Sequence, residues 1–255
     1  MTGKLLWRGM LAGILAALLA TLFARVYAEP QVDRAIAFEA SHEAHMAGHD
    51  HGADDHGDDD HGDDEAKAPV SRATQKSIGL ATAVVLYGSA VGGIFSLIFA
   101  YCYGRIGRIG PRTLAVLIAA LGFLVIVIVP GLKYPPNPPA VGQPDTIQMR
   151  TAAYFAMILV SIVALFLASR IRAMTIQTLG AFDALLAGVA AYVVVIAIAQ
   201  FGLPAIDEVP SDFPATILWH FRVASIGMQL ILWTTLGLAF GWMAERCLSS
   251  AGPRR

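Results

Sequence analysis

The stretch IGLATAVVLYGSAVGGIFSLIFAYCY, residues 78–103, contains no charged side chain, and it decides the class of fold. A helix needs about 20 consecutive apolar residues to cross about 30 Å of hydrocarbon, so this stretch predicts a transmembrane helix. Four later segments reach or approach the same length, at residues 113–132, 152–168, 179–202 and 223–243. With 56% hydrophobic and only 15% charged residues, the chain is predicted to be an all-α polytopic membrane protein.

Residues 7–28, upstream of that stretch, form a further apolar segment. The small residues of Val26-Tyr27-Ala28 fit a signal-peptidase site, so the segment is either a cleaved signal sequence or a retained first transmembrane helix. Arg25 is unusual just before such a site, and Gly9-xxx-Gly13 is typical of a helix face that packs on another helix. These features favour retention, which gives six transmembrane helices.

Basic residues predict the orientation of the helices. They gather at the start of the chain, in two of the connections and in the tail: Lys4, Arg8, Arg105, Arg108, Arg112, Arg170, Arg172, Arg246, Arg254 and Arg255. The positive-inside rule places these regions, and with them the N and C termini, in the cytoplasm. Seventeen of the nineteen acidic residues then fall in three outward-facing loops, leaving Asp183 and Glu245.

The predicted spans divide the chain into four parts. Residues 1–28 form the first transmembrane helix, and residues 29–77 form an extracytoplasmic loop rich in His and Asp. Residues 78–243 form a five-helix bundle with proline-rich outer loops at 130–150 and 203–222, followed by a cytoplasmic tail at 244–255. Residues 130–150 carry six prolines, which fix φ and disfavour helix, so we expect a stiff, extended cover.

The first outer loop contains SHEAHMAGHDHGADDHGDDDHGDDE, residues 41–65, with six of the seven histidines and ten carboxylates. Imidazole and carboxylate groups are ligands for divalent transition metals, so we expect this stretch to bind them. The candidate ligands are His42, His45, His49, His51, His56 and His61. The composition predicts a disordered chain that wraps an ion or, in the alternative reading, only an acidic spacer. Such ligands do not select cobalt over copper or nickel.

Four residues outside this stretch are further candidates. His220 lies close in sequence to the acids of the last outer loop, either as a seventh metal ligand or as an interfacial residue. Asp183, Gln200 and Gln229 are polar groups within apolar spans, where such groups often mark an ion pathway. Each has a structural alternative to the ion pathway. The Asp183 carboxylate would be stabilised by the dipole of a helix N-terminus, and the two glutamines would form hydrogen bonds between helices.

Several catalytic and binding patterns do not occur in the sequence. It has no phosphate-binding GxxxxGK[ST] loop, nucleophile elbow, HExxH or CxxCH, so we expect no enzyme activity, no permanently bound cofactor and no nucleic-acid partner. Cys102 and Cys247 are far apart and indicate no disulfide framework. A divalent cation moving inward gains about 4.6 kcal/mol per 100 mV without ATP, which is enough to drive uptake.

Three stretches go beyond composition: EPQVDRAIAFE at residues 29–39, GLKYPPNPPAVGQPDTIQMRT at 131–151 and DEVPSDFPATILWHFR at 207–222. With the six-span layout and the His-rich first loop, the chain resembles the predicted cobalt transporter subunit family CbtA along essentially its whole length. The resemblance implies a multi-pass protein of the bacterial inner membrane that takes up cobalt for cobalamin synthesis. It also implies a small, single-span, histidine-bearing partner subunit of the CbtB kind. The family is commonly described with five spans, one fewer than the six predicted from this sequence. The two numbers agree if residues 7–28 are removed or are left out of the family's count.

Two functions follow as hypotheses. In the first, the chain is a membrane subunit for uptake of a divalent transition metal, with cobalt favoured over nickel or zinc, and the outer loop captures ions that the bundle conducts. In the second, the bundle anchors a periplasmic metal-binding or assembly module and conducts no ions. In both, the metal is a substrate, and membrane lipid surrounds the helices.

Overall fold

The structure is a computed structural model that describes residues 2–47, 80–139, 141–142 and 144–249. These residues form helices and connecting segments, with no strand among them. The helices are α1 (Thr2–Phe23), the π-helical turn η1 (Ala24–Ala28), α2 (Glu29–Ala47), α4 (Leu80–Cys102), α5 (Pro111–Gly122), the π-helical turn η4 (Phe123–Ile128), α6 (Val129–Lys133), the 3-10 turn η5 (Pro144–Thr146), α7 (Ile147–Gly202) and α8 (Ala215–Ser249).

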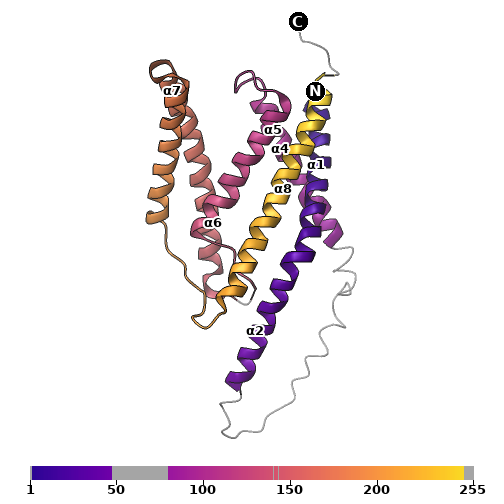
Figure 1. The fold of residues 1–255 in the computed structure, drawn as a ribbon, viewed down its shortest axis with the longest axis vertical. Helices are drawn as coiled ribbons and strands as arrows, with labels where there is room; N and C mark the ends of the chain where they lie inside the picture. The colour runs from indigo at the N-terminus through magenta and orange to yellow at the C-terminus, as the bar shows by residue number, and fades with distance from the viewer. Residues whose placement is uncertain (1, 48–79, 140, 143, 250–255) are drawn as a thin grey trace.

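Five helices in the described part of the chain are long and apolar enough to cross a membrane, as expected for an all-α polytopic protein. One of them, α7, contains a break at Gly180, where φ is 81° and ψ is 173°. Glycine adopts this conformation without the clash that a Cβ atom would cause. The two arms of α7 run side by side in opposite directions (Figure 1), and they carry the spans expected at 152–168 and 179–202.

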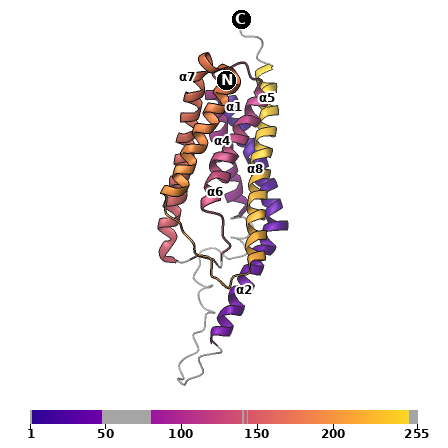
Figure 2. The ribbon, with the colours of Figure 1, turned by 60° about the vertical axis from the view of Figure 1, so that its left-hand side comes forward.

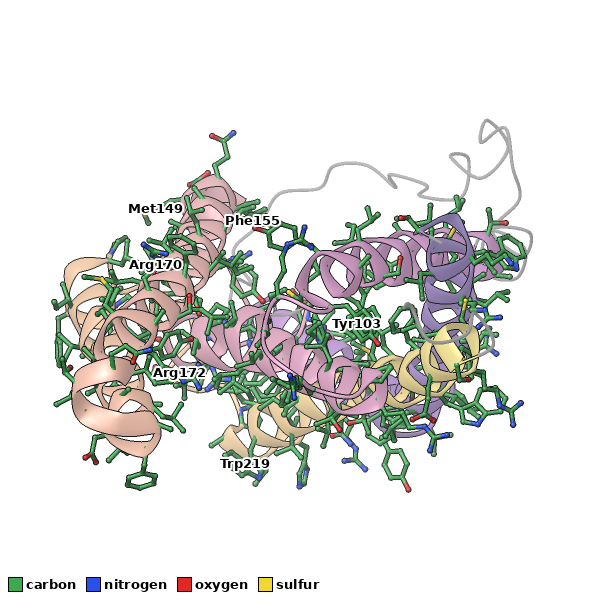
Figure 3. The ribbon with its side chains drawn as sticks, turned by 90° about the horizontal axis from the view of Figure 1, so that it is seen from above. Tyr103, Met149, Phe155, Arg170, Arg172 and Trp219 are labelled. Atoms are coloured by element: carbon green, nitrogen blue, oxygen red, sulfur yellow. The ribbon has the colours of Figure 1, made fainter. Side chains whose placement is uncertain are left out.

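The arrangement of the helices brings four segments that carry basic residues to one end of the molecule. The start of α1, the α4–α5 connection, the turn of α7 and the end of α8 lie together there, which we call the basic end (Figures 1 and 2). Arg170 and Arg172 are labelled in the view from that end (Figure 3). The segments 134–146 and 203–214 lie at the opposite end with α2, which we call the proline-rich end.

The closest helix contact joins α1 to α4 through two glycine pairs. Gly9 and Gly13 of α1 face Gly88 and Gly92 of α4 so closely that a Cβ atom at Gly92 would lie 2.0 Å from the carbonyl oxygen of Gly9. A Cβ atom at Gly13 would lie equally close, 2.0 Å, to the carbonyl oxygen of Gly88. Both motifs therefore act as close-packing faces, and they pack on each other. The first helix is part of the core of the bundle.

Helix α8 joins this pair to α5. Gly237 and Gly241 of α8 lie against Ala119 and Ala115 of α5, where a Cβ atom would meet the alanine methyl groups at 2.7 and 3.2 Å. The Phe240 ring packs edge-on against two rings of α4, those of Phe95 and Phe99, with centroids 5.4 and 5.0 Å apart. The helices α1, α4, α5 and α8 thus share one apolar core.

The α7 hairpin packs on the rest of the bundle through α6 and the segment after it. Val129 and Tyr134 contact a second apolar cluster that includes Met157 on the first arm and Ile196 on the second. The two arms are joined by a 2.8 Å hydrogen bond between the hydroxyl groups of Ser161 and Tyr192. The hairpin is therefore a paired unit with its own small core.

Two helices continue past a proline. The first helix was expected to end at residue 28, but it continues through Pro30 to Ala47, and the third-span helix continues through Pro130 to Lys133. A proline ring normally clashes with the carbonyl four residues earlier. In both cases that carbonyl, of Val26 or Ile126, belongs to a wider π-helical turn, η1 or η4, which relieves the clash.

These helices correct two expectations about the loops. Residues 29–47, expected to be loop, are helical, and this helix includes the backbone of His42 and His45. The cover expected over 130–150 is extended only in part, because α6 includes Pro130 and α7 begins at Ile147. His49, His51, His56 and His61 lie outside the described residues.

Candidate functional site

The three stretches that carry the family resemblance come together at the proline-rich end. Ala35 of α2, Val141 of the second stretch and Phe213 of the third form one buried cluster, with 0%, 4% and 7% of their surfaces exposed. The rings of Phe38 and Phe213 pack edge to face, with centroids 5.3 Å apart. We call this assembly of residues 29–39, 131–146 and 203–222 the proline-rich cap.

A buried ion pair holds the cap together. The Glu208 side chain, only 5% exposed, pairs with the Arg150 guanidinium and accepts a hydrogen bond from the Thr146 hydroxyl. Gly142, with φ of 133°, lies directly over the pair, and a Cβ atom there would be 2.5 Å from Arg150 Nη1. Such a charge-assisted contact fixes the third stretch against the start of α7.

Further hydrogen bonds join the cap to the bundle. The Tyr134 hydroxyl donates to the carbonyl of Pro204 at 2.8 Å, and Arg222 Nη2 of α8 donates to Asn137 Oδ1 at 2.9 Å. Lys133 Nζ donates to the carbonyl of Gln200 at 2.5 Å. These bonds connect α6, the proline-rich segment, the end of α7 and the start of α8, so the cap is a fixed platform.

Helix α2 rises from this platform and extends beyond the other helices (Figure 1). Its 19 residues span about 28 Å at about 1.5 Å per residue. The backbone of α2 reaches His42 and His45, and the chain enters the rest of the His/Asp stretch (residues 41–65) directly after Ala47. The cap therefore fixes the point from which this stretch begins.

Among the described residues, His220 is not part of a metal-binding group with the acids that were expected to accompany it. Its side chain is exposed on the first turns of α8, next to Trp219, which is labelled in Figure 3. Glu208 is engaged with Arg150 inside the cap. Within residues 2–47, 80–139, 141–142 and 144–249, no three His, Cys, Asp or Glu side chains gather into a group that could hold a metal ion.

The three candidate pathway residues lie in three separate places. Asp183 is exposed at the basic end, three residues after Gly180. Gln200 is at the opposite end of the same arm, where its carbonyl accepts the bond from Lys133. Gln229 lies midway along α8 and lines a groove between α8 and α4. The fold does not bring these three residues together.

The groove beside Gln229 has a volume of about 1100 Å³. Small residues of α1 and η1 form its floor, and the start of α4 and the middle of α8 form its walls; the floor residues are Ala17, Ala20, Ala24 and Ala28. Its polar lining includes Thr21, Arg25, Glu29 and Tyr87. Sequence reasoning did not single out Glu29, because it follows the point where the first helix was expected to end.

Comparison with known proteins bears out the resemblance. No curated protein and no solved structure matches the chain. A family model described as "Probable cobalt transporter subunit (CbtA)" matches residues 2–245, which include the bundle, the cap and the His/Asp stretch. The chain, in whose described part five helices are long and apolar enough to cross a membrane, therefore belongs to the CbtA family of probable cobalt transporter subunits.

Proposed function

We propose that this chain is the membrane subunit of a cobalt uptake system and that it captures Co²⁺ outside the cytoplasm with the His/Asp stretch. Membership of the cobalt transporter subunit family supports the substrate. The observation that carries the capture role is α2, a helix anchored in the cap at Ala35 and Phe38 that leads directly into the stretch. The cap holds the start of the His/Asp stretch at the proline-rich end of the bundle.

The proposed topology has six crossings, with each arm of α7 counted as one. The basic end faces the cytoplasm and the proline-rich end faces the periplasm, so the chain is a multi-pass protein of the bacterial inner membrane. The collection of Arg105, Arg112, Arg170 and Arg246 at one end supports this orientation, because basic residues are retained on the cytoplasmic side.

The chemistry of capture follows from the ligands. Neutral imidazoles bind Co²⁺ through nitrogen, and the neighbouring aspartates add oxygen ligands and a negative potential that concentrates cations. The candidate ligands are His42, His45, His49, His51, His56 and His61, with His220 exposed on the cap as a further one. These donors also accept nickel and zinc, so the supply of metal contributes to selectivity.

The family description as a subunit supports the presence of a second component. The partner we propose is a small, single-span, histidine-bearing protein of the CbtB kind, and the imported cobalt serves cobalamin synthesis. The membrane potential drives Co²⁺ inward, since two charges gain about 4.6 kcal/mol per 100 mV.

The separation of Asp183, Gln200 and Gln229 favours a second candidate function. In that function the bundle anchors a periplasmic cobalt-binding module, and another subunit conducts the ion. The cap and α2 have the same role in both functions, which is to fix the metal-binding stretch at the membrane surface.

Cobalt accumulation in cells tests the proposal and separates the two functions. The variants are the full chain, the chain with its six clustered histidines changed to glutamine, and a chain lacking residues 48–65. Loss of uptake at limiting cobalt with recovery at high cobalt supports capture by this stretch and conduction by the bundle. Loss at every concentration supports the anchored module, and unchanged uptake at limiting cobalt contradicts capture.

A further inference from the structure

The groove between α4 and α8 is lined by Arg25, an exposed and charged side chain. Arg25 of η1 makes no hydrogen bond or ion pair with any residue that the structure describes, and it lies over a floor of alanines. Arg25 is exposed, and at the surface of a membrane-spanning helix an anion with several oxygens would satisfy the donors of its guanidinium group. Its positive charge also disfavours a divalent cation in this groove.

The depth of Arg25 matches that of a lipid phosphate. Arg8, on the same helix, donates to the carbonyl of Met243 at the basic end. Arg25 lies 17 residues further along, or about 26 Å at about 1.5 Å per residue, close to the hydrocarbon thickness of about 30 Å. With Arg8 at one edge of the hydrocarbon layer, this spacing would place Arg25 near the other edge, where phosphate groups begin.

A second charge lies one helical turn further from the membrane centre. Glu29 lines the same groove and is four residues after Arg25, which places it about 6 Å further out along the helix. Moving outward, the groove thus presents alanines, then a cation, then an anion. A zwitterionic phospholipid presents the complementary order of acyl chain, phosphate and ammonium.

We infer that this groove binds a phospholipid with a phosphoethanolamine headgroup. An acyl chain lies along Ala17, Ala20 and Ala24, the phosphate accepts hydrogen bonds from Arg25, and the ammonium group donates to Glu29. A phosphoglycerol headgroup satisfies Arg25 but offers Glu29 no positive charge, so the groove prefers the ethanolamine lipid. The inference does not depend on the route of the metal ion.

Native mass spectrometry of the full chain with added phosphatidylethanolamine or phosphatidylglycerol tests this inference. We expect the chain to retain phosphatidylethanolamine preferentially, and Arg25→Gln to weaken retention about tenfold, the effect of losing one hydrogen bond to a charged group. Glu29→Gln should retain both lipids and lose the preference. Arg34→Gln and Glu39→Gln, at exposed positions of α2 outside the groove, are matched controls that should behave as the unaltered chain.

A variant that keeps both charges tests whether lipid binding depends on the shape of the groove as well as on Arg25 and Glu29. Ala28→Trp fills the groove floor and should release the lipid, although Arg25 and Glu29 remain. Unchanged retention in Arg25→Gln, or equal retention of the two lipids by the unaltered chain, would overturn the inference. A photo-crosslinking residue at Tyr87 in native membranes should give a lipid adduct. A polypeptide adduct there would assign the groove to a protein partner and also overturn it.

Discussion

Replacing Gly92 by alanine should loosen the contact between α1 and α4. The new Cβ atom would lie 2.0 Å from the carbonyl oxygen of Gly9 and 2.9 Å from Gly13 Cα, whereas real Cβ contacts stay above 3.0 Å. Both obstacles are backbone atoms, so no side chain can rotate away and the helices must separate. Overpacking of this kind costs about 1–3 kcal/mol, and we expect the upper part of that range, a change of about 100-fold in the unfolding equilibrium.

The neighbouring residue provides a matched control. Alanine at Gly93 would place its Cβ atom 3.7 Å from Leu6 Cδ1 and 3.8 Å from Met10 Cγ, which are ordinary contacts. Gly93→Ala should therefore change the free energy of unfolding by less than about 1 kcal/mol. The assay is equilibrium unfolding of the purified chain in mixed micelles of increasing SDS content. Equal stability of the two variants would refute the glycine contact.

Three further outcomes follow from the structure. Glu208→Gln should destabilise the cap by about 2–3 kcal/mol, slightly below the usual cost of breaking a buried ion pair, because Arg150 is partly exposed. Protection of the cap against protease should fall in this variant. Asp207→Asn, at an exposed position, should leave the protection unchanged. Gly180→Ala should lower the free energy of unfolding by about 1–2 kcal/mol in the same SDS assay, because the φ of Gly180 is 81°. Gly202→Ala, at an equally open position without positive φ, should lower it less. Similar losses in the two variants would contradict the break in α7. Calorimetry of a peptide of residues 41–65 should show Co²⁺ binding near pH 7. This binding should be lost below about pH 6, because protonated imidazoles cannot bind the metal. Binding that is unchanged at pH 5 would exclude the histidines as ligands.

The sequence was sufficient for the positions of the apolar helices, because hydropathy and length are local properties. It was not sufficient for their partners. The spacing of Gly9 with Gly13 and of Gly88 with Gly92 indicated close approach, but only the folded chain shows that these pairs face each other. The continuation of two helices through Pro30 and Pro130 depends on π-helical turns, for which the sequence carries no simple signal.

The candidate site was predicted in part. The three stretches at 29–39, 131–151 and 207–222 were chosen by resemblance, and their convergence into one cap required the topology of the whole bundle. Asp183, Gln200 and Gln229 were chosen because they are polar in apolar segments, but polarity does not tell which face of a helix a residue occupies. Gln229 lines the groove between α4 and α8, next to the Arg25 and Glu29 charges on which the lipid inference rests.

Capture of cobalt from outside requires the His/Asp stretch to lie on the extracytoplasmic side of the membrane. Labelling of Ala53→Cys with a membrane-impermeant maleimide in intact cells measures this directly, and Cys102, at the end of α4 near the basic end, serves as an internal control. We predict that the cysteine at position 53 reacts in intact cells and that Cys102 reacts only after the membrane is opened. Protection of position 53 until the cells are permeabilised would place the stretch in the cytosol and contradict capture of cobalt from outside.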